Sequence, residues 1–300
     1  MKSCPSCQAL CHDKARFCPS CGANVAEAQA SDADPFVGHT LADKYLIKKL
    51  IGEGGMGRVY EAEQLALEKP VAVKVLHQHL LGDDHSVARF VAEAKEASRL
   101  NHPNIVSVIE FGETAYNVMF IVMEYLRGKP LADIIADEYP LSFRRVVKIF
   151  RQVLLAISAA HQLGVLHRDL KPDNVFIEEL ADGSERVKVI DFGIAKRFDT
   201  DEQGLTSPGM VCGTPEYMSP EQVTGDPLDP RSDVYALGIL LYEMLVGTPP
   251  FLGKTPAEVM IMQAEDEPLS PSHAAAEQPI PASMDAIVLW ALAKDRDERL

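Results

Sequence analysis

The 300-residue sequence has no apolar run near the roughly 18 residues that a membrane-spanning helix needs. The longest candidate, "VYALGILLYEMLVG" at 234–247, is shorter and contains Glu243. The N-terminus "MKSCPSCQAL" has no apolar stretch after Lys2, which excludes a signal peptide. As it stands, the sequence predicts a cytoplasmic location.

Positive charge is scarce as well, because 29 Lys and Arg residues stand against 44 Asp and Glu residues, a formal net charge of −15. A chain this acidic is a poor general binder of nucleic acid or anionic lipid, although a local basic pocket for phosphate stays open. Hydrophobic residues make up 47% and charged residues 24%, the balance of a folded globular chain. The length of 300 residues predicts two lobes or domains of ordinary size.

Cysteine is nearly absent after residue 21: five of the six lie in the first 21 residues, and Cys212 stands alone. This distribution excludes a disulfide framework of a secreted fold and favours a reducing compartment with a metal site. Two "CPSC" knuckles resemble a short zinc ribbon, in which four thiolates hold a tetrahedral Zn²⁺. The four predicted ligands are Cys4, Cys7, Cys18 and Cys21.

Other interpretations of this N-terminal segment stay open. Cys11 and His12 could substitute as ligands, and a redox dithiol pair is the alternative to a metal site. In so small a segment, metal binding would supply most of the folding free energy. Residues 1–38 carry three Lys or Arg and four Asp or Glu, so no basic surface for nucleic acid is predicted. We therefore expect a protein-docking or sensing module.

Composition divides the chain into a Cys-rich segment (1–24), a linker (25–40) and a large domain (41–300). The expected fold class is α+β, with a small β-rich lobe (41–123) followed by a larger helical lobe (127–300). Alternating apolar residues predict antiparallel strands over 45–75, 104–113 and 118–126. Apolar residues at helical spacing predict helices over 83–100, 142–163, 219–223, 231–246 and 283–293.

"IGEGGMGRVY" places Gly52, Gly54 and Gly57 in G-x-G-x-x-G spacing. Glycines let a backbone approach phosphate closely, because no Cβ is in the way. The spacing also occurs in dinucleotide-binding folds and in plain hairpin turns, but the dinucleotide interpretation requires a helix to open at the third glycine. Strand-like "RVYEAE" follows here, so we expect the loop to fold back as a hairpin over its ligand.

"PVAVKVL" places Lys74 inside an apolar strand, where it is either an edge-strand surface residue or a buried cation. The two-residue period of a strand turns Val73 and Val75 to the opposite face. Glu93 in the next helix is the expected ion-pair partner, with Glu96 as the alternative acid. Such a pair would direct Lys74 toward phosphate oxygens.

"GVLHRDLKPDNVFIEE" at 164–179 sets charged residues between two apolar runs. Asp169 and Asn174 can serve there as the acceptor of a hydroxyl proton and as a metal ligand, and Lys171 can reach a transferring phosphoryl group. In "VIDFGIAK", Asp191 ends an apolar strand and offers a hard oxygen ligand suited to Mg²⁺.

Taken in order, six motifs make the sequence resemble a Ser/Thr protein kinase of the bacterial, eukaryotic-like kind. The motifs are "GEGGMGRVY", "VAVK", "RFVAEA", "HRDLKPDN", "DFG" and "GTPEYMSPE". The resemblance covers about residues 40–300 and implies a bilobal protein-kinase fold preceded by the zinc ribbon. It also implies ATP and Mg²⁺ (or Mn²⁺) as cofactors, protein substrates, and self-association for autophosphorylation.

Residue roles follow from the resemblance position by position. Asp169 is implied as the catalytic base, Lys171 as a phosphate contact, and Lys74 as a second one that is held by Glu93. Met123 resembles the gatekeeper, ahead of a hinge that binds adenine through its backbone. The implied ATP-binding residues are Gly52, Gly54, Gly57, Val59, Ala72, Lys74, Met123, Glu124 and Leu126.

The resemblance implies further roles around these residues. Asn174 and Asp191 are the implied Mg²⁺ ligands. His167 and Phe192 resemble packing residues of an internal spine, and Asp233 resembles the helix aspartate that holds the catalytic-loop backbone.

The resemblance also implies the substrate class. Lys171 and Thr214 are typical of Ser/Thr kinases at these positions, where tyrosine kinases differ. The "SPE" triplet departs from the family pattern, because Ser219 replaces an alanine. This change leaves Glu221 available to pair with Arg299.

Segment 194–213 is expected to carry regulatory phosphorylation at Thr206 first, and otherwise at Ser207 or Thr200. A phosphate adds a charge of about −1.5 to −2, which Arg168 could anchor. The alternative is that these are solvated loop hydroxyls. Cys212 is expected to be a packed loop residue, with oxidation left open.

Two functions of different class compete. An active kinase is favoured over a pseudokinase scaffold, because the core residues Lys74, Glu93, Asp169, Asn174 and Asp191 are all present. A nucleic-acid-binding regulator would need a basic face that the sequence lacks. Because the family continues its last helix beyond Arg299, we expect a longer protein in which a membrane anchor or sensor domain could follow.

Overall fold

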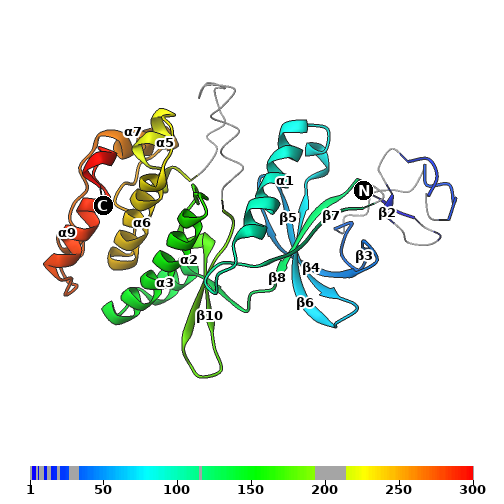
Figure 1. Ribbon diagram of the computed structural model, residues 1–300, viewed down its shortest axis with the longest axis horizontal. Coiled ribbons are helices and arrows are strands. Elements are labelled where there is room, and N and C mark those ends of the chain that lie inside the picture. The colour runs from blue at the N-terminus through cyan, green and yellow to red at the C-terminus, as the bar shows by residue number, and fades with distance from the viewer. Residues whose placement is uncertain are drawn as a thin grey trace. The chain divides into compact units, whose positions relative to one another are not determined.

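Figure 1 shows a computed structural model of the chain, which describes residues 2–4, 6, 10–11, 15–18, 21–26, 34–114, 117–192 and 214–299. The chain forms two compact units. The first unit comprises residues 1–94 with 107–126, and the second comprises 95–106 with 127–300. None of the helices in the described ranges is both long and apolar enough to cross a membrane.

The first unit is built on an antiparallel six-stranded sheet in the order β3-β4-β5-β6-β8-β7, with helix α1 beside it (Figure 1). A separate two-stranded pair, β1 and β2, lies in the Cys-rich segment. The strands and helices are β1 (Lys2–Ser3), β2 (Leu10–Cys11), β3 (Thr40–Leu41), β4 (Tyr45–Glu53), β5 (Gly57–Gln64), β6 (Lys69–Leu76), η1 (Gln78–Leu80), α1 (Asp84–Arg99), β7 (Val108–Glu113) and β8 (Met119–Glu124).

Side-chain alternation in β6 gives the sheet two apolar faces. Val71, Val73 and Val75 are buried in one cluster, which also holds tyrosines of β4 and β5. On the other face, Phe90 and Ala94 of α1 pack against apolar residues of β6 and β8. The predicted opposition of the valines to Lys74 is therefore present, and it follows from the two-residue period of a strand.

The second unit is mainly helical and contains a three-stranded antiparallel sheet in the order β11-β10-β9. Its elements are β9 (Gly128–Pro130), α2 (Leu131–Glu138), α3 (Phe143–Gln162), η2 (Pro172–Asn174), β10 (Val175–Glu179), β11 (Glu185–Val189), η4 (Pro215–Tyr217), α5 (Pro220–Thr224), α6 (Pro230–Val246), α7 (Pro256–Glu265), α8 (Pro271–Ala274), α9 (Ala282–Ala291) and η5 (Arg296–Glu298).

Helix α6 contains the longest apolar run of the sequence and is the core of the second unit. It packs against both α3 and α9 (Figure 1), and most of its residues from Ser232 to Leu245 are buried. A helix that is apolar all round is expected to be buried in this way. A Cβ on Gly238 would lie 2.9 Å from the Ala291 Cβ, so the glycine permits the close approach of α9.

Of the β10–β11 hairpin, the sequence analysis predicted only the apolar strand that ends at Asp191, which corresponds to β11, and it missed β10, β9, α2, α7 and α8. Both hairpin strands are five residues long and rich in charge, so their apolar periodicity is weak. An Asp-Gly pair at 182–183 lies between them and was an available turn signal. The strand predicted over 104–113 begins later, at Val108, because Ile105 pairs with Val189 of the second unit instead.

Candidate active site

The glycine-rich stretch forms the predicted hairpin between β4 and β5, and no helix opens at its third glycine. Gly54 N donates to Gly57 O at 2.9 Å, which closes the turn. The third glycine also has a packing role, because a Cβ on Gly57 would lie 2.2 Å from Val75 O of β6. His77 Nε2 lies 2.9 Å from Gly54 O and ties the turn to the end of β6.

Lys74 lies on β6, between β5 and β8, so it is not an edge-strand residue. Its Nζ donates to Glu93 Oε1 on α1 at 2.6 Å, and the two side chains are only 12% and 11% exposed. The predicted ion pair is present, with Glu93 as the partner. Because both charged side chains have so little exposure to water, the pair keeps a defined geometry, unlike an ion pair on the surface.

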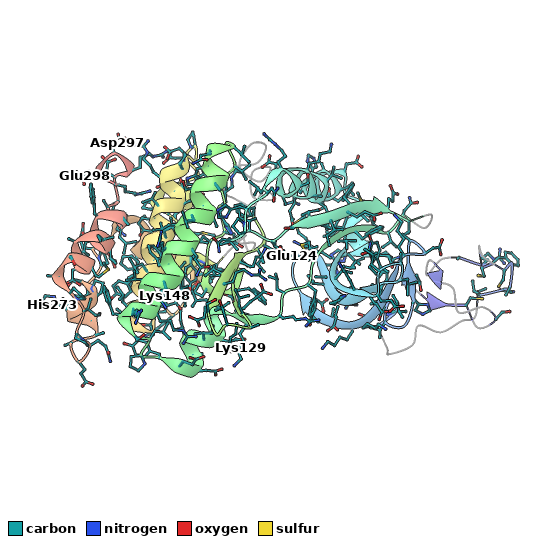
Figure 2. All side chains as sticks on the ribbon, turned by 60° about the horizontal axis from the view of Figure 1, so that its bottom comes forward. Glu124, Lys129, Lys148, His273, Asp297 and Glu298 are labelled. Carbon is teal, nitrogen blue, oxygen red and sulfur yellow. The ribbon has the colours of Figure 1, made fainter. Side chains whose placement is uncertain are left out.

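The remaining residues expected at ATP lie on neighbouring strands of the same sheet. Val59 pairs with Lys74 across β5 and β6, and Ala72 pairs with Met123 across β6 and β8. Glu124, labelled in Figure 2, ends β8 and accepts from Ser107 N at 2.7 Å through Oε1. Leu126 is partly buried and is the last residue of the first unit.

In the second unit, Asp233 of α6 organises the backbone of the loop at 167–169. Its carboxylate accepts from His167 N at 2.8 Å and from Arg168 N at 2.9 Å, and its Oδ2 lies 2.7 Å from His161 Nε2. Burial by itself raises the pKa of Asp233, but the bonds from His161 and the two amides outweigh it and hold the pKa below its usual value. The ionised carboxylate is thus a fixed anchor for the loop.

Asp169 and Asn174 are joined within this loop, because Asn174 Nδ2 donates to Asp169 O at 2.8 Å. Lys171 Nζ donates to Thr214 Oγ1 at 2.9 Å, which connects the loop to the segment that begins at 214. A carboxylate, an ammonium group and an amide therefore lie within one short turn. Such a set can accept a proton, neutralise a phosphoryl group and ligate a metal ion.

Asp191 follows β11 and is linked to the same loop through its neighbours. Ile190 N donates to Asn174 O at 2.9 Å, and His167 Nε2 lies 3.1 Å from Ile190 O. Asp191 has φ 51°, in the left-handed region that non-glycine residues rarely adopt. Because such strain persists only where the surroundings enforce it, it is typical of functional sites.

His167 and Phe192 behave as the packing residues that the resemblance implied. Their ring centroids lie 4.7 Å apart, and both side chains are buried. Complete burial lowers the pKa of His167, so the imidazole is neutral at pH 7.

Two structural pairs involve helix α5. Arg299 contacts Glu221 with a shortest separation of 2.7 Å, as the sequence predicted. Ser219 also has a clear local role: it is the N-cap of α5 and forms a capping box with Gln222. The departure from alanine at this position therefore adds a helix cap.

Sequence analysis missed four contributors to the site. His161 supports Asp233, and Gln222 Nε2 donates to Arg168 O at 2.8 Å. Tyr217 donates its hydroxyl to Glu243 Oε2 at 2.6 Å. The capping-box spacing could have marked Gln222 as part of a helix start, but no local pattern signals the other contacts.

The Cys-rich segment brings three of the four predicted thiols together. The Sγ atoms of Cys4, Cys18 and Cys21 all lie within 4.8 Å of one another, and those of Cys4 and Cys21 are 3.6 Å apart. Ser6 N lies 3.4 Å from Cys4 Sγ in hydrogen-bonding geometry. Cys7 lies outside the described residues, as do His12, Cys212 and the predicted phosphorylation sites Thr200, Thr206 and Ser207.

Comparisons with known proteins agree with this geometry. The family model described as "Protein kinase domain" matches residues 45–300. The chain is 48% identical to the serine/threonine-protein kinase pkn3 of Myxococcus xanthus over 270 residues, which cover 89% of this chain and 49% of that protein. It is 42% identical over 262 residues to the serine/threonine-protein kinase PknB of Mycobacterium tuberculosis, which cover 86% of this chain and 41% of that protein.

A solved structure, the kinase domain of Mycobacterium tuberculosis PknI, matches with a TM-score of 0.66 and 29% identity, over 88% of this chain and 92% of that one. The chain belongs to the protein kinase family, in its serine/threonine branch. It spans about half the length, or less, of the curated relatives it matches.

Proposed function

We propose that this protein transfers the γ-phosphoryl group of ATP to serine and threonine hydroxyls of proteins, including those of its own activation segment. The observation that carries the proposal is the Lys171–Thr214 hydrogen bond of 2.9 Å, because it joins the two residues that resemble the Ser/Thr branch. The proposed location is the cytoplasm, where ATP is available and thiols stay reduced.

In the proposed reaction, the substrate oxygen forms a bond to the γ-phosphorus while the bond to the β–γ bridging oxygen breaks and ADP leaves. Asp169 accepts the hydroxyl proton, and Lys171 neutralises charge on the transferring group. Catalysis of this kind depends on positioning and electrostatics more than on covalent chemistry. The anchoring of the loop by Asp233 supports this assignment.

Asn174 and Asp191 are the proposed Mg²⁺ ligands, and their donor atoms fit, because amide and carboxylate oxygens are hard ligands. The Asn174 Nδ2–Asp169 O bond leaves the amide oxygen of Asn174 as its ligand atom. The Ile190 N–Asn174 O bond ties the residue next to Asp191 to the same turn. When bound, the metal ion would neutralise charge on the phosphates.

The first unit is proposed to hold the nucleotide. Gly52, Gly54 and Gly57 would cover the phosphates, and Lys74 would contact them from its pair with Glu93. The proposed adenine site comprises Val59, Ala72, Met123, Glu124 and Leu126. The buried ion pair supports this assignment, because a lysine fixed by a carboxylate directs its remaining donors toward a ligand.

The N-terminal segment 1–24 is proposed to be a zinc ribbon, joined by a linker (25–40) to the kinase domain (41–300). Tetrahedral Zn²⁺ with Zn–S bonds of about 2.3 Å places its sulfurs about 3.8 Å apart, and the Cys4–Cys21 separation of 3.6 Å is close to this value. Zinc content by elemental mass spectrometry tests it. One equivalent in the wild type, lost in Cys18→Ser, supports the ribbon, and a wild type without zinc under reducing conditions argues for the dithiol alternative.

Intact mass and phosphosite mapping after incubation of dephosphorylated protein with ATP and Mg²⁺ test the kinase activity. We expect phosphoryl gain on Thr206, Ser207 or Thr200, and none in an Asp169→Asn control. If neither the chain nor an added protein substrate gains phosphate, the pseudokinase scaffold becomes the better account.

A further inference from the structure

The second unit contains an open groove of about 1020 Å³ that none of the proposed catalytic residues lines. Its walls come from α2, α3, the start of β9 and the β10–β11 hairpin. Figure 2 labels Lys148 on α3 and Lys129 on β9, two of the residues that line it. Five Lys or Arg and three Glu line the groove, so it carries a net charge of +2 in a chain whose net charge is −15.

The lining cations divide into paired and unpaired groups. Arg145 is neutralised by Glu138 and by Glu185, the latter at 2.8 Å, and Lys129 lies 3.4 Å from Asp137. The other three form no ion pair with any residue in the described ranges. These three are Arg127, Lys148 and Arg151.

Helix α3 is the source of two of the unpaired cations. Its twenty residues include four Lys or Arg and no Asp or Glu. Lys148, Arg151 and Leu155 follow at helical spacing and so share one face. All three side chains are exposed and line the groove. This face of α3 is therefore positively charged, with an apolar side chain at its end.

The groove is held open by contacts between its walls. Arg145 Nε donates to Glu185 Oε1 at 2.9 Å, and Val187 N donates to Gln152 Oε1 at 3.0 Å, so α3 is tied to β11 at two points. Ile134 and Ile177 are buried and supply apolar lining. A rigid surface loses little conformational entropy when it binds a ligand.

We propose that this groove is a docking site for an acidic segment of a protein substrate that carries an apolar side chain among its carboxylates. The unpaired Arg127, Lys148 and Arg151 select negative charge, and Leu155 with the two isoleucines receives the apolar side chain. A basic segment is repelled by the same cations.

The effect of docking on phosphorylation rests on the proposed kinase function. Strand β10 starts directly after Asn174, so the groove and the candidate catalytic loop belong to the same unit. A substrate tethered by its acidic segment would meet Asp169 at a raised effective concentration. We therefore expect docking to lower the KM of tethered substrates and to leave kcat unchanged.

Fluorescence anisotropy measures the docking step without catalysis. The probe is a labelled twelve-residue peptide of glutamates with two leucines, and its matched control has lysines in place of the glutamates. We expect the glutamate peptide to bind and its affinity to fall as salt increases. In the double variant Lys148→Glu/Arg151→Glu, Kd should rise at least about tenfold.

The matched control variant is Arg144→Glu, a charge reversal at an exposed site on the same helix that does not line the groove. We expect its Kd to change less than about twofold. Equal Kd values in the wild type and the double variant, or no binding to the wild type, overturn the proposal. Arginine-dependent binding of an oligonucleotide without binding of the peptide also overturns it and points to nucleic acid.

A kinetic comparison separates this proposal from the kinase function itself. Two substrates share one phosphorylatable peptide, and only one carries the acidic segment. We expect the double variant to raise KM for the tethered substrate alone. If neither substrate is phosphorylated, the kinase function fails while the anisotropy result still decides the docking site. If both are phosphorylated with one common KM in the wild type, docking of substrates is wrong.

Discussion

Arg299 Nη1 and Glu221 Oε1 lie 2.7 Å apart, although 78 residues separate them in the sequence. Their side chains are 0% and 3% exposed. Burial by itself raises the pKa of Glu221, but hydrogen bonds from Arg299 and Ser232 outweigh it and hold the pKa below its usual value. The pair joins α5 to the C-terminal end of the described chain, and both charges depend on it.

Removal of one partner of the Arg299–Glu221 pair should destabilise the fold. In Arg299→Gln, the Glu221 carboxylate stays buried without its cation, so we expect the free energy of unfolding to fall by about 3–5 kcal/mol. The control Lys48→Gln breaks the exposed pair with Glu63 and should cost less than about 1 kcal/mol. Urea unfolding measures both. Similar small losses in the two variants would show that the buried pair is not special.

The Lys74–Glu93 pair should affect turnover more than folding. Glu93→Gln keeps a hydrogen-bond acceptor but removes the charge, so we expect kcat to fall roughly a hundredfold. We expect a smaller loss of stability than in Arg299→Gln, because the side chains of Lys74 and Glu93 are still 12% and 11% exposed. Glu93→Asp should recover part of kcat. Glu96→Gln, the other acid on α1, should stay within about twofold of the wild type. A larger loss in the Glu96 variant would reject Glu93 as the positioning residue.

Asp233 accepts three hydrogen bonds with one carboxylate, which an asparagine cannot do because it has a single acceptor oxygen. In Asp233→Asn we expect a loss of roughly a hundredfold in kcat and of about 3 kcal/mol in stability. Asp226→Asn, at an exposed acid, is the control. Steady-state kinetics and thermal unfolding separate the two effects, and a variant with normal kcat would contradict the anchoring role.

Glu243 should make stability depend on pH near neutrality. Burial raises its pKa to about 7, and nearby Asp173 and Glu216 add to the rise, although the Tyr217 hydroxyl donates to it. Between pH 4.5, the ordinary pKa of the group, and about pH 7, the folded state therefore keeps a proton that the unfolded state has lost. The stability from this proton is fully present below pH 4.5 and is lost as pH rises through 7.

Glu243→Gln tests this linkage, because glutamine still accepts from Tyr217 but cannot ionise. We expect the variant to gain about 1–3 kcal/mol relative to the wild type between pH 5 and pH 8. Melting temperatures across that range give the result. If the difference in stability between wild type and variant is the same from pH 5 to pH 8, the pKa of Glu243 is not raised into this range.

Much of the site could be predicted from local sequence. The hairpin at Gly52–Gly57 follows from glycines flanked by strand-forming residues, and the opposition of Lys74 to Val73 follows from strand alternation. Charge complementarity also identified the Lys74–Glu93 pair, because a buried cation requires a buried acid, whereas the Glu221–Arg299 pair was predicted from the resemblance to the kinase family. These inferences succeed because each depends on spacing within one element or on the need to neutralise a buried charge.

The pairing of β10 with β11 was not predicted from the sequence. These short charged strands carry little periodicity, so nothing marked Glu185 as the partner of Arg145. Whether a cation of α3 is neutralised or open to a ligand depends on which strand passes beside it. Arg145 and Lys148 are one helical turn apart and look alike in the sequence, yet only Arg145 has an acid within reach in the described structure.

By itself, the sequence determined the class of protein, through the resemblance of its ordered motifs to the protein kinase family. It also determined which residues turn toward each face of a strand or helix, because these depend on local periodicity. Only the tertiary structure decided which distant groups meet where neither the resemblance nor charge complementarity indicated a pair. The bond from Gln222 to Arg168 O, the Tyr217–Glu243 contact and the unpaired cations of the groove all arise from packing between elements far apart in the chain. These long-range contacts follow from the way the whole fold buries its apolar surface, and no local sequence pattern predicts them.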